Sequence, residues 1–269
     1  MAQSPVKLAA MEHGLPVYQP ERIRGSENID LLKSLAADLM VVVGYGQIIP
    51  QAIIDLPPHG ILNVHASLLP KYRGAAPIQW AIANGEKETG VTIMQIDAGL
   101  DTGDMLLKSS TGIHPDETSP QLSARLAQLG AGLLMEAIGQ IASGTIAREK
   151  QDNAQATLAP ILKKEDGLIV WSRPARQIYN RLRGFQPWPG AYSAFRGQQL
   201  GIAWAAIGDG KALELGKMRH DKRRLFVGCA GNTTLELLEV QPAGKKRMSG
   251  EAFLNGYKIP QNERLGDLS

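Results

Sequence analysis

Apolar stretches alternate with polar, glycine-containing stretches along the first half of the chain, as in an α/β domain. A near-continuous apolar run over 38–44 predicts a buried strand of the kind found in parallel sheets. Residues 61–65 predict a second short buried strand, and residues 91–96 a third. Weaker patterns predict a strand over Leu15–Gln19 and helices over Ser4–Met11, Asn28–Ala37 and Ala76–Asn84.

The clearest helix signal covers Ser119–Ser143, where apolar residues recur at helical spacing. Ser119 is a candidate N-cap, Pro120 suits the first turn, and Gly144 can end the helix. We expect this helix to cover one face of the sheet. The recurring apolar residues are Leu122, Leu126, Leu129, Leu133, Ala137 and Ile141.

The pattern changes after residue 144. Residues 145–164 are polar and rich in alanine and glutamine, so they predict a linker between a domain at 1–144 and another at 165–269. The second part opens with an amphipathic helix over Pro174–Arg183, with Arg176, Arg181 and Arg183 on its polar faces. Short strand-like runs then predict a small barrel. They cover Ala191–Phe195, Gln199–Ala206, Ala212–Leu215, Arg224–Cys229 and Thr233–Val240.

Composition fits a water-soluble chain with an ordinary core. Of the 269 residues, 43% are hydrophobic and 20% are charged, and apolar runs such as Leu39–Val43 are far too short to span a bilayer. The lone Cys229 cannot form an internal disulfide, which fits a reducing cytoplasm. Without a cluster of cysteine and histidine, we expect no structural zinc.

The net charge of +3 hides an asymmetry between the two parts. Residues 1–162 carry 11 Lys and Arg against 16 Asp and Glu, a net of −5, whereas residues 163–269 carry 18 against 10, a net of +8. This division suggests a catalytic domain joined to one that holds a polyanion. A solvated basic surface without function is the alternative.

Candidate chemistry gathers at the ends of two predicted strands. Side chains alternate across a strand, so Asn63 and His65 share one face of 61–65. The strand over 91–96 runs into an acidic, glycine-punctuated loop at 97–104 that contains Asp101. Ligands in open α/β sheets bind beyond the carboxyl ends of the strands. An amide, an imidazole and a carboxylate there form a plausible acyl-transfer site.

These residues carry a family resemblance. Asn63-x-His65-x-Ser67-Leu-Leu-Pro70-x-x-Arg73-Gly74, with Asp101 in Leu-Asp-Thr-Gly at the usual distance from His65, resembles the folate-dependent formyltransferase family. Further segments resemble those members whose acceptor is initiator methionyl-tRNA, used in translation initiation. They are Ser4-Pro-Val-Lys7, Arg73-Gly-Ala-Ala-Pro-Ile-Gln79, Gly184-Phe-x-Pro-Trp-Pro189 and Gln241-Pro-Ala-Gly-Lys-Lys246.

The resemblance implies an α/β catalytic domain with a mostly parallel, Rossmann-like sheet and a smaller C-terminal OB-like β-barrel that contacts tRNA. It implies 10-formyltetrahydrofolate as co-substrate and no metal. By the same likeness Asn63, His65 and Asp101 are catalytic, and the segment Ser67, Leu68, Leu69 and Pro70 lies along the folate. Candidate tRNA contacts are Arg73, Lys245, Lys246 and Arg247, and we expect a cytoplasmic monomer that works away from membranes.

The family begins with a strand–helix–strand unit and a basic loop, which the resemblance places before Ser4-Pro-Val-Lys7. We therefore expect the true start to lie upstream of Met1, so that 1–144 is an N-terminally truncated catalytic domain; a natural truncation is the alternative. The rival functions are formylation of an amino sugar nucleotide or glycinamide ribonucleotide, and an inactive RNA-binding relative.

Each feature also has an ordinary interpretation when taken alone. A single strand histidine is usually structural, and aspartates beside glycines usually form turns. Gly44-Tyr-Gly46 suggests a dinucleotide site, but Ile49 stands where a third glycine is needed. The aspartates of 97–104 do not have EF-hand spacing, so calcium is not expected. Only the joint pattern favours a formyl-transfer site.

Overall fold

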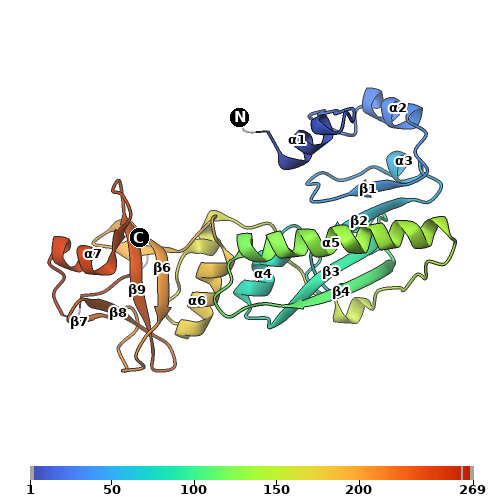
Figure 1. The fold of residues 1–269 in the computed structure, drawn as a ribbon. Coiled ribbons are helices and arrows are strands. Elements are labelled where there is room, and N and C mark those ends of the chain that lie inside the picture. Colours follow the sequence, from blue (N-terminus) through green and yellow to red (C-terminus); the bar gives the residue numbers. More distant parts are fainter. Residues whose placement is uncertain (1–2, 262, 267–269) are drawn as a thin grey trace.

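The computed structural model describes residues 3–261 and 263–266. They form an α/β part and a β-rich part that lie end to end, with α6 between the two sheets (Figure 1). The elements of the first part are α1 (Pro5–Glu12), α2 (Ser26–Ser34), β1 (Met40–Val42), α3 (Gln51–Ile54), β2 (Ile61–His65), α4 (Pro77–Ala83), β3 (Glu88–Gln95), β4 (Met105–Gly112) and α5 (Ser119–Ala142).

The first sheet has the strand order β1-β2-β3-β4. β1 and β2 are parallel, whereas β2–β3 and β3–β4 are antiparallel. The prediction of a mostly parallel sheet is therefore wrong for these strands, and the sheet is mixed. The loop after β3 leads directly into β4, and a connection so short can return only antiparallel, because a parallel return needs a crossover of a dozen or more residues.

Of two strand predictions near the start of the chain, one is correct only in part and the other is wrong. Residues 38–44 contribute only the short β1, whose middle residue Val41 is 40% exposed and whose next residue after the strand, Val43, is 66% exposed. Among the described residues β1 pairs with β2 alone, so it forms a sheet edge rather than a buried strand. Residues 15–19 form no strand, since no neighbouring strand lies there to receive their backbone hydrogen bonds.

The long helix α5 forms as expected and covers one face of the sheet (Figure 1). Its cap differs from the prediction: Thr118 is the N-cap, in a capping box with Gln121. Ser119 is the first helical residue, and its hydroxyl donates to the carbonyl of Gly184. The buried apolar side of α5 packs on Leu62, Ile82, Val91 and Ile93 through Leu122, Leu126, Leu133 and Ala137.

The second part is an antiparallel sheet in the order β5-β6-β9-β8-β7, with β10 paired to β9. Between residues 3–261 and 263–266 no pairing joins β5 to β7, so the expected closed barrel is not found. Its elements and those of the linker are η1 (Asn153–Gln155), η2 (Lys164–Gly167), α6 (Ala175–Gly184), β5 (Tyr192–Phe195), β6 (Gln198–Ile207), β7 (Met218–Asp221), β8 (Arg224–Cys229), β9 (Thr233–Pro242), β10 (Met248–Ser249) and α7 (Gly250–Tyr257).

The strand expected over 212–215 is a loop, and the edge strand is β7 instead. Gly210 and Gly216 flank the loop with φ of 73° and 71°, a left-handed conformation that interrupts a strand. The sequence pattern gave no indication of β10 or α7. In the parts of the chain that the structure describes, no helix is long and apolar enough to cross a membrane.

Helices α4 and α6 pack against each other where the two parts of the molecule meet. They approach closely at Gly184, where an added Cβ would lie 2.9 Å from the backbone of Gln79 and Ala83. Trp80 and Phe185 meet beside it, edge to face, with ring centroids 5.2 Å apart. The Gly-Phe pair of the Gly184–Pro189 motif thus builds the junction between the domains.

Arg183, expected on a polar face of its helix, is buried at this junction and 4% exposed. Its guanidinium donates to the carbonyls of Glu117, at 2.9 Å, and His114, at 3.3 Å, and to Asn180 Oδ1 at 3.1 Å. Burial lowers the pKa of Arg183, because removal from water disfavours its charged form. Contact with the first domain, which periodicity within α6 cannot reveal, accounts for the difference.

Candidate active site

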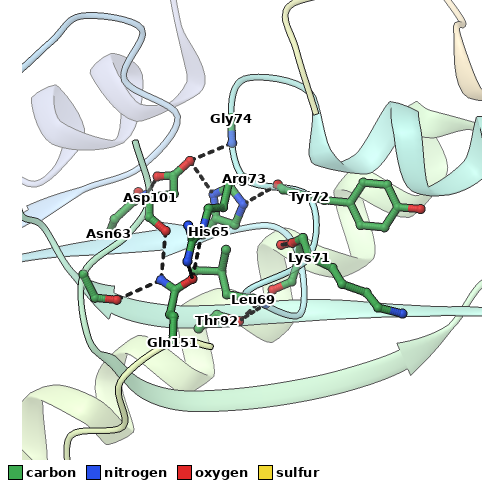
Figure 2. A network of polar contacts seen from close by, with 12 residues as sticks. Asn63, His65, Leu69, Lys71, Tyr72, Arg73, Gly74, Thr92, Asp101 and Gln151 are labelled. Atoms are coloured by element: carbon green, nitrogen blue, oxygen red, sulfur yellow. Dashed lines mark hydrogen bonds and ion pairs between the residues drawn. The ribbon is translucent and has the colours of Figure 1, made fainter. Parts of the chain in front are cut away.

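β2 delivers Asn63 and His65 to the face of the sheet opposite α5 (Figure 2). The strand has the predicted bounds, and its alternate residues Leu62 and Val64 pack in the α5 core. His65 pairs in register with Thr92 of β3, and Asn63 with Met94. His65 is buried, at 5% exposure, so its ring is held by the protein rather than by solvent.

The contacts of the His65 ring indicate which of its two nitrogens carries a hydrogen. Nε2 lies 2.9 Å from the carbonyl oxygen of Tyr72, which can only accept, so Nε2 carries a hydrogen. Nδ1 lies 3.7 Å from Asp101 Oδ2. A neutral ring with its hydrogen on Nε2 presents a bare nitrogen to that carboxylate, whereas the imidazolium gives both nitrogens a favourable partner. Nδ1 is therefore the atom that can take up and return a proton.

The carbonyl that orients His65 is itself anchored. Tyr72 has a left-handed backbone, with φ of 62°, and its N–H donates to Thr157 Oγ1 at 2.9 Å. Its hydroxyl donates to Glu86 Oε1 at 2.7 Å, and burial raises the pKa of Tyr72 to about 12. The phenol stays protonated at neutral pH and holds the turn in place.

Asp101 reaches the two β2 side chains from the loop between β3 and β4 (Figure 2). Its Oδ1 accepts from Asn63 Nδ2 at 3.2 Å, and its Oδ2 accepts from the backbone N–H of Gly74 at 2.8 Å. The structure thus brings Asn63, His65 and Asp101 together. An amide nitrogen carries two hydrogens, so the bond to Asp101 leaves one on Asn63 for another acceptor.

The segment expected along the folate forms a compact turn beside this cluster. Ser67 and Leu69 are buried: the Ser67 hydroxyl donates to the Lys71 carbonyl at 2.6 Å, and Leu69 packs against Met94 and Met105. Thr92 links the turn to β3, accepting from Leu69 N at 3.1 Å and donating to Ser67 O at 2.7 Å. Leu68 and Pro70 are half-buried and keep some accessible surface.

Sequence reasoning missed Gln151, which it assigned to a featureless linker. Its Nε2 donates to the carbonyls of Asp101 and Gly103, both at 2.8 Å. Its Oε1 accepts from Arg73 Nε at 2.9 Å and Nη2 at 2.7 Å (Figure 2). The partners lie 48 to 78 residues away in the sequence, and no local pattern signals such contacts.

The candidate tRNA contacts are in very different settings. Arg73 is 7% exposed and its guanidinium is bound to Gln151 and to Asn153 Oδ1, so it braces the linker instead of facing solvent. Lys245, Lys246 and Arg247 are exposed at the turn between β9 and β10. In the described ranges 3–261 and 263–266 these three form no ion pair.

A second basic cluster in the same domain is largely neutralised. Arg219 pairs with Asp209, Arg223 with Glu251, and Arg224 with Glu236. A surface groove lies beside the 245–247 turn, lined by Gln199, Gly201, Gln241, Pro242, Ala243 and Gly244.

Within the described part of the chain, no three His, Cys, Asp or Glu side chains lie close enough to hold a metal ion.

Comparison with known families gives two matches. Residues 1–138 match the family described as formyl transferase, and residues 161–258 match formyl transferase, C-terminal domain. A methionyl-tRNA formyltransferase of Solibacter usitatus is 56% identical over 266 residues, covering 99% of this chain and 85% of that protein. The same-named protein of Koribacter versatilis is 56% identical over 270 residues, covering 100% and 86%.

Solved structures share the fold at lower identity. An N-formyltransferase from Helicobacter canadensis, in complex with folinic acid and dTDP-3-aminofucose, superimposes with a TM-score of 0.68 at 18% identity, covering 90% of this chain and 85% of that one. HypX from Aquifex aeolicus, in complex with tetrahydrofolic acid, gives 0.64 at 16% identity, covering 87% and 42%. At these identities the likeness concerns the fold alone.

Proposed function

This chain belongs to the formyl transferase family, and we propose that it moves the formyl group of 10-formyltetrahydrofolate to the α-amino group of methionyl-tRNA. The observation that carries the acceptor is the likeness, over nearly the whole chain, to relatives named for that reaction. The chemistry is supported by the cluster of Asn63, His65 and Asp101.

The reaction needs an amine nucleophile and stabilisation of the formyl oxygen. An α-amino group has a pKa of about 7.7–8.0, so a useful fraction is neutral near pH 7 without a strong base. As the amine attacks the formyl carbon, negative charge develops on the formyl oxygen. We propose that the second hydrogen of Asn63 Nδ2 donates to it, because the first is already used by Asp101.

Collapse of the tetrahedral intermediate requires a proton on N10 and the loss of one from the attacking nitrogen. We propose that His65 Nδ1 and Asp101, 3.7 Å apart, exchange these protons with the substrate, directly or through water. The C–N10 bond breaks, the new C–N bond remains, and the site returns to its starting protonation state. We place the folate along the turn at 67–70, with Leu68 and Pro70 as its accessible side chains.

We propose the division 1–144, 145–164 and 165–269 for the catalytic domain, linker and tRNA-binding domain; the matches to two separate family models, at 1–138 and 161–258, support a two-domain organisation. An OB-like barrel remains the proposal for the C-terminal domain, supported by its antiparallel strands. The whole is proposed to act as a cytoplasmic monomer. Light scattering after gel filtration should then give a mass near 29.0 kDa.

The catalytic assignment is tested by formyl transfer from 10-formyltetrahydrofolate to methionyl-tRNA. Asn63→Ala should lower kcat by about 10² to 10³, the usual loss for one oxyanion donor. Asn255→Ala, on the exposed surface of α7, is the matched control and should leave kcat unchanged. Turnover by Asn63→Ala within threefold of the parent would contradict the role of Asn63. Transfer by the parent only to an amino sugar nucleotide would contradict methionyl-tRNA as the acceptor.

The basic turn is the proposed tRNA contact, formed by Lys245, Lys246 and Arg247, whereas Arg73 is left out because its guanidinium is already bound. Replacing all three with alanine should raise the KM for tRNA and reduce the slope of log KM against log salt by roughly 2 to 3, near one per phosphate contact. Lys222→Ala with Arg223→Ala, on the other basic cluster, is the control. Equal salt slopes in the parent and the triple variant would refute the assignment.

A further inference from the structure

The linker bonds to segments of the catalytic site both before and after Gln151 in the sequence. Before it, Glu149 forms a backbone bridge with Met105, at the start of β4. After it, Thr157 and Ala159 bond to the backbone of Arg73. Gln151 therefore sits where the linker, which includes the short helix η1, passes between the loop that carries Asp101 and the turn that carries Arg73.

Chemistry fixes the orientation of the Gln151 amide. Arg73 can only donate and the carbonyls of Asp101 and Gly103 can only accept, so Oε1 must face the guanidinium and Nε2 must face the loop. All four contacts are within 2.9 Å, and Asn153 adds a third bond to the same guanidinium. The result is a chain of directed bonds from the 66–74 turn, through one side chain, to the catalytic loop.

The loop needs such support. Asp101 has a left-handed backbone with φ of 50°, a conformation that costs energy for any residue with a Cβ, although aspartate tolerates it better than most. Its carboxylate is held by Asn63 and Gly74, but the backbone carbonyls of residues 101 and 103 depend on Gln151. Release of those carbonyls would let the loop relax and carry the carboxylate away from His65.

We propose that Gln151 is a positioning residue that holds Asp101 in its catalytic place, so that the interdomain linker forms part of the active site. The inference rests on the proposed function for its catalytic consequence. It does not rest on it for the loop geometry. Gln151 touches no reacting atom; it acts through Asp101.

Two replacements separate this role from simple anchoring of Arg73. Gln151→Glu keeps the length of the side chain and turns the Arg73 contact into an ion pair, but it sets a carboxylate oxygen against two carbonyl oxygens. Gln151→Ala removes both the contact with Arg73 and the bonds to the two loop carbonyls. If Gln151 only satisfied Arg73, the glutamate variant would behave like the parent. Gln155→Ala, in the same linker but bonded only to Asp152, is the control.

The first measurement is hydrogen exchange, followed by mass spectrometry, in peptides covering 95–106. Exchange should rise in both Gln151 variants, because the amides of Gln95 and Met105 bond to the loop end and to the linker. Peptides from the middle of α5 should be unchanged, and Gln155→Ala should match the parent throughout. Parent-like exchange in Gln151→Ala, or in Gln151→Glu, would overturn the proposal.

The second measurement is kinetic. Both Gln151 variants should lose about 10- to 100-fold in kcat, the loss expected for a small displacement of a catalytic group, while the KM for tRNA stays within twofold. A parent-like kcat for Gln151→Glu would overturn the proposal. If the parent itself transferred no formyl group to methionyl-tRNA, the proposed function would fail, and the exchange data alone would still decide whether Gln151 holds the loop.

Discussion

Replacing Arg183 with methionine should destabilise the protein at the junction between its two parts. The guanidinium is almost fully buried and supplies hydrogen bonds to the carbonyl of Glu117 and to Asn180 Oδ1, with a longer one to the carbonyl of His114. Methionine fills similar space but donates nothing. The variant therefore leaves these acceptors buried without a partner.

The magnitude follows from those acceptors. Each buried group left unsatisfied costs about 1–3 kcal/mol, so the two shorter contacts together cost about 2–6 kcal/mol. Burial lowers the pKa of Arg183, which indicates that the charge is itself costly to bury, and its removal recovers part of the loss. We expect a net decrease of about 2–4 kcal/mol in the free energy of unfolding, a large share of the usual 5–15 kcal/mol.

Equilibrium unfolding in urea, followed by circular dichroism and tryptophan fluorescence, measures this loss. Arg176→Met on the exposed side of α6 is the matched control and should stay within about 0.5 kcal/mol of the parent. In Arg183→Met the two signals should also separate, because the parts no longer unfold as one unit. A cost for Arg183→Met no larger than that of the control would refute the reasoning.

Three further outcomes are expected. Gly74→Ala should abolish transfer, because φ is 115° there and the new Cβ would lie 2.8 Å from the carbonyl oxygen of Ala159; steady-state kinetics checks this. Cys229 should resist a disulfide reagent at pH 8 until urea is added, since burial raises the pKa of its thiol to about 12. Glu117 has a pKa lowered from 4.5, because bonds from Arg125 and His114 outweigh the raising effect of burial. The stability that Glu117 contributes is thus present above about pH 4.5 and lost as pH falls through its folded pKa, so the deficit of Glu117→Gln in urea unfolding should shrink as the pH falls below 4.5.

The parts of the fold that sequence predicted correctly are those with local signals. β2 has the expected bounds, and α5 follows from a long apolar period closed by a recognisable terminus. Asn63 and His65 could be placed on one face because strand alternation requires it. The direction of strand pairing could not be predicted, since alternation is the same in parallel and antiparallel ladders.

The remaining features depend on contacts between distant segments. β1 reads as a buried strand from its apolar residues, but burial depends on neighbours that its own sequence does not encode. Arg183 falls on a polar face of α6 by periodicity and is nonetheless buried, because the other domain covers that face. Gln151 sits in a segment without periodicity, and its importance comes from carbonyls in a loop some 50 residues earlier.

The path of the linker decides how such proteins can be recombined. Consider a chimera of two relatives joined at residue 144, where composition and charge change. Its linker residues 149–159 would come from the second parent, while the loop at 97–104 and the turn at 66–74 would come from the first. In that chimera, residues 149–159 would come from one parent, whereas the loop and the turn to which they bond would come from the other. A crossover after Ala159, whose N–H makes the last bond to Arg73, keeps all three segments from one parent. Exchange of C-terminal domains between relatives should be tolerated at the second position and fail at the first wherever residues 149–159 differ.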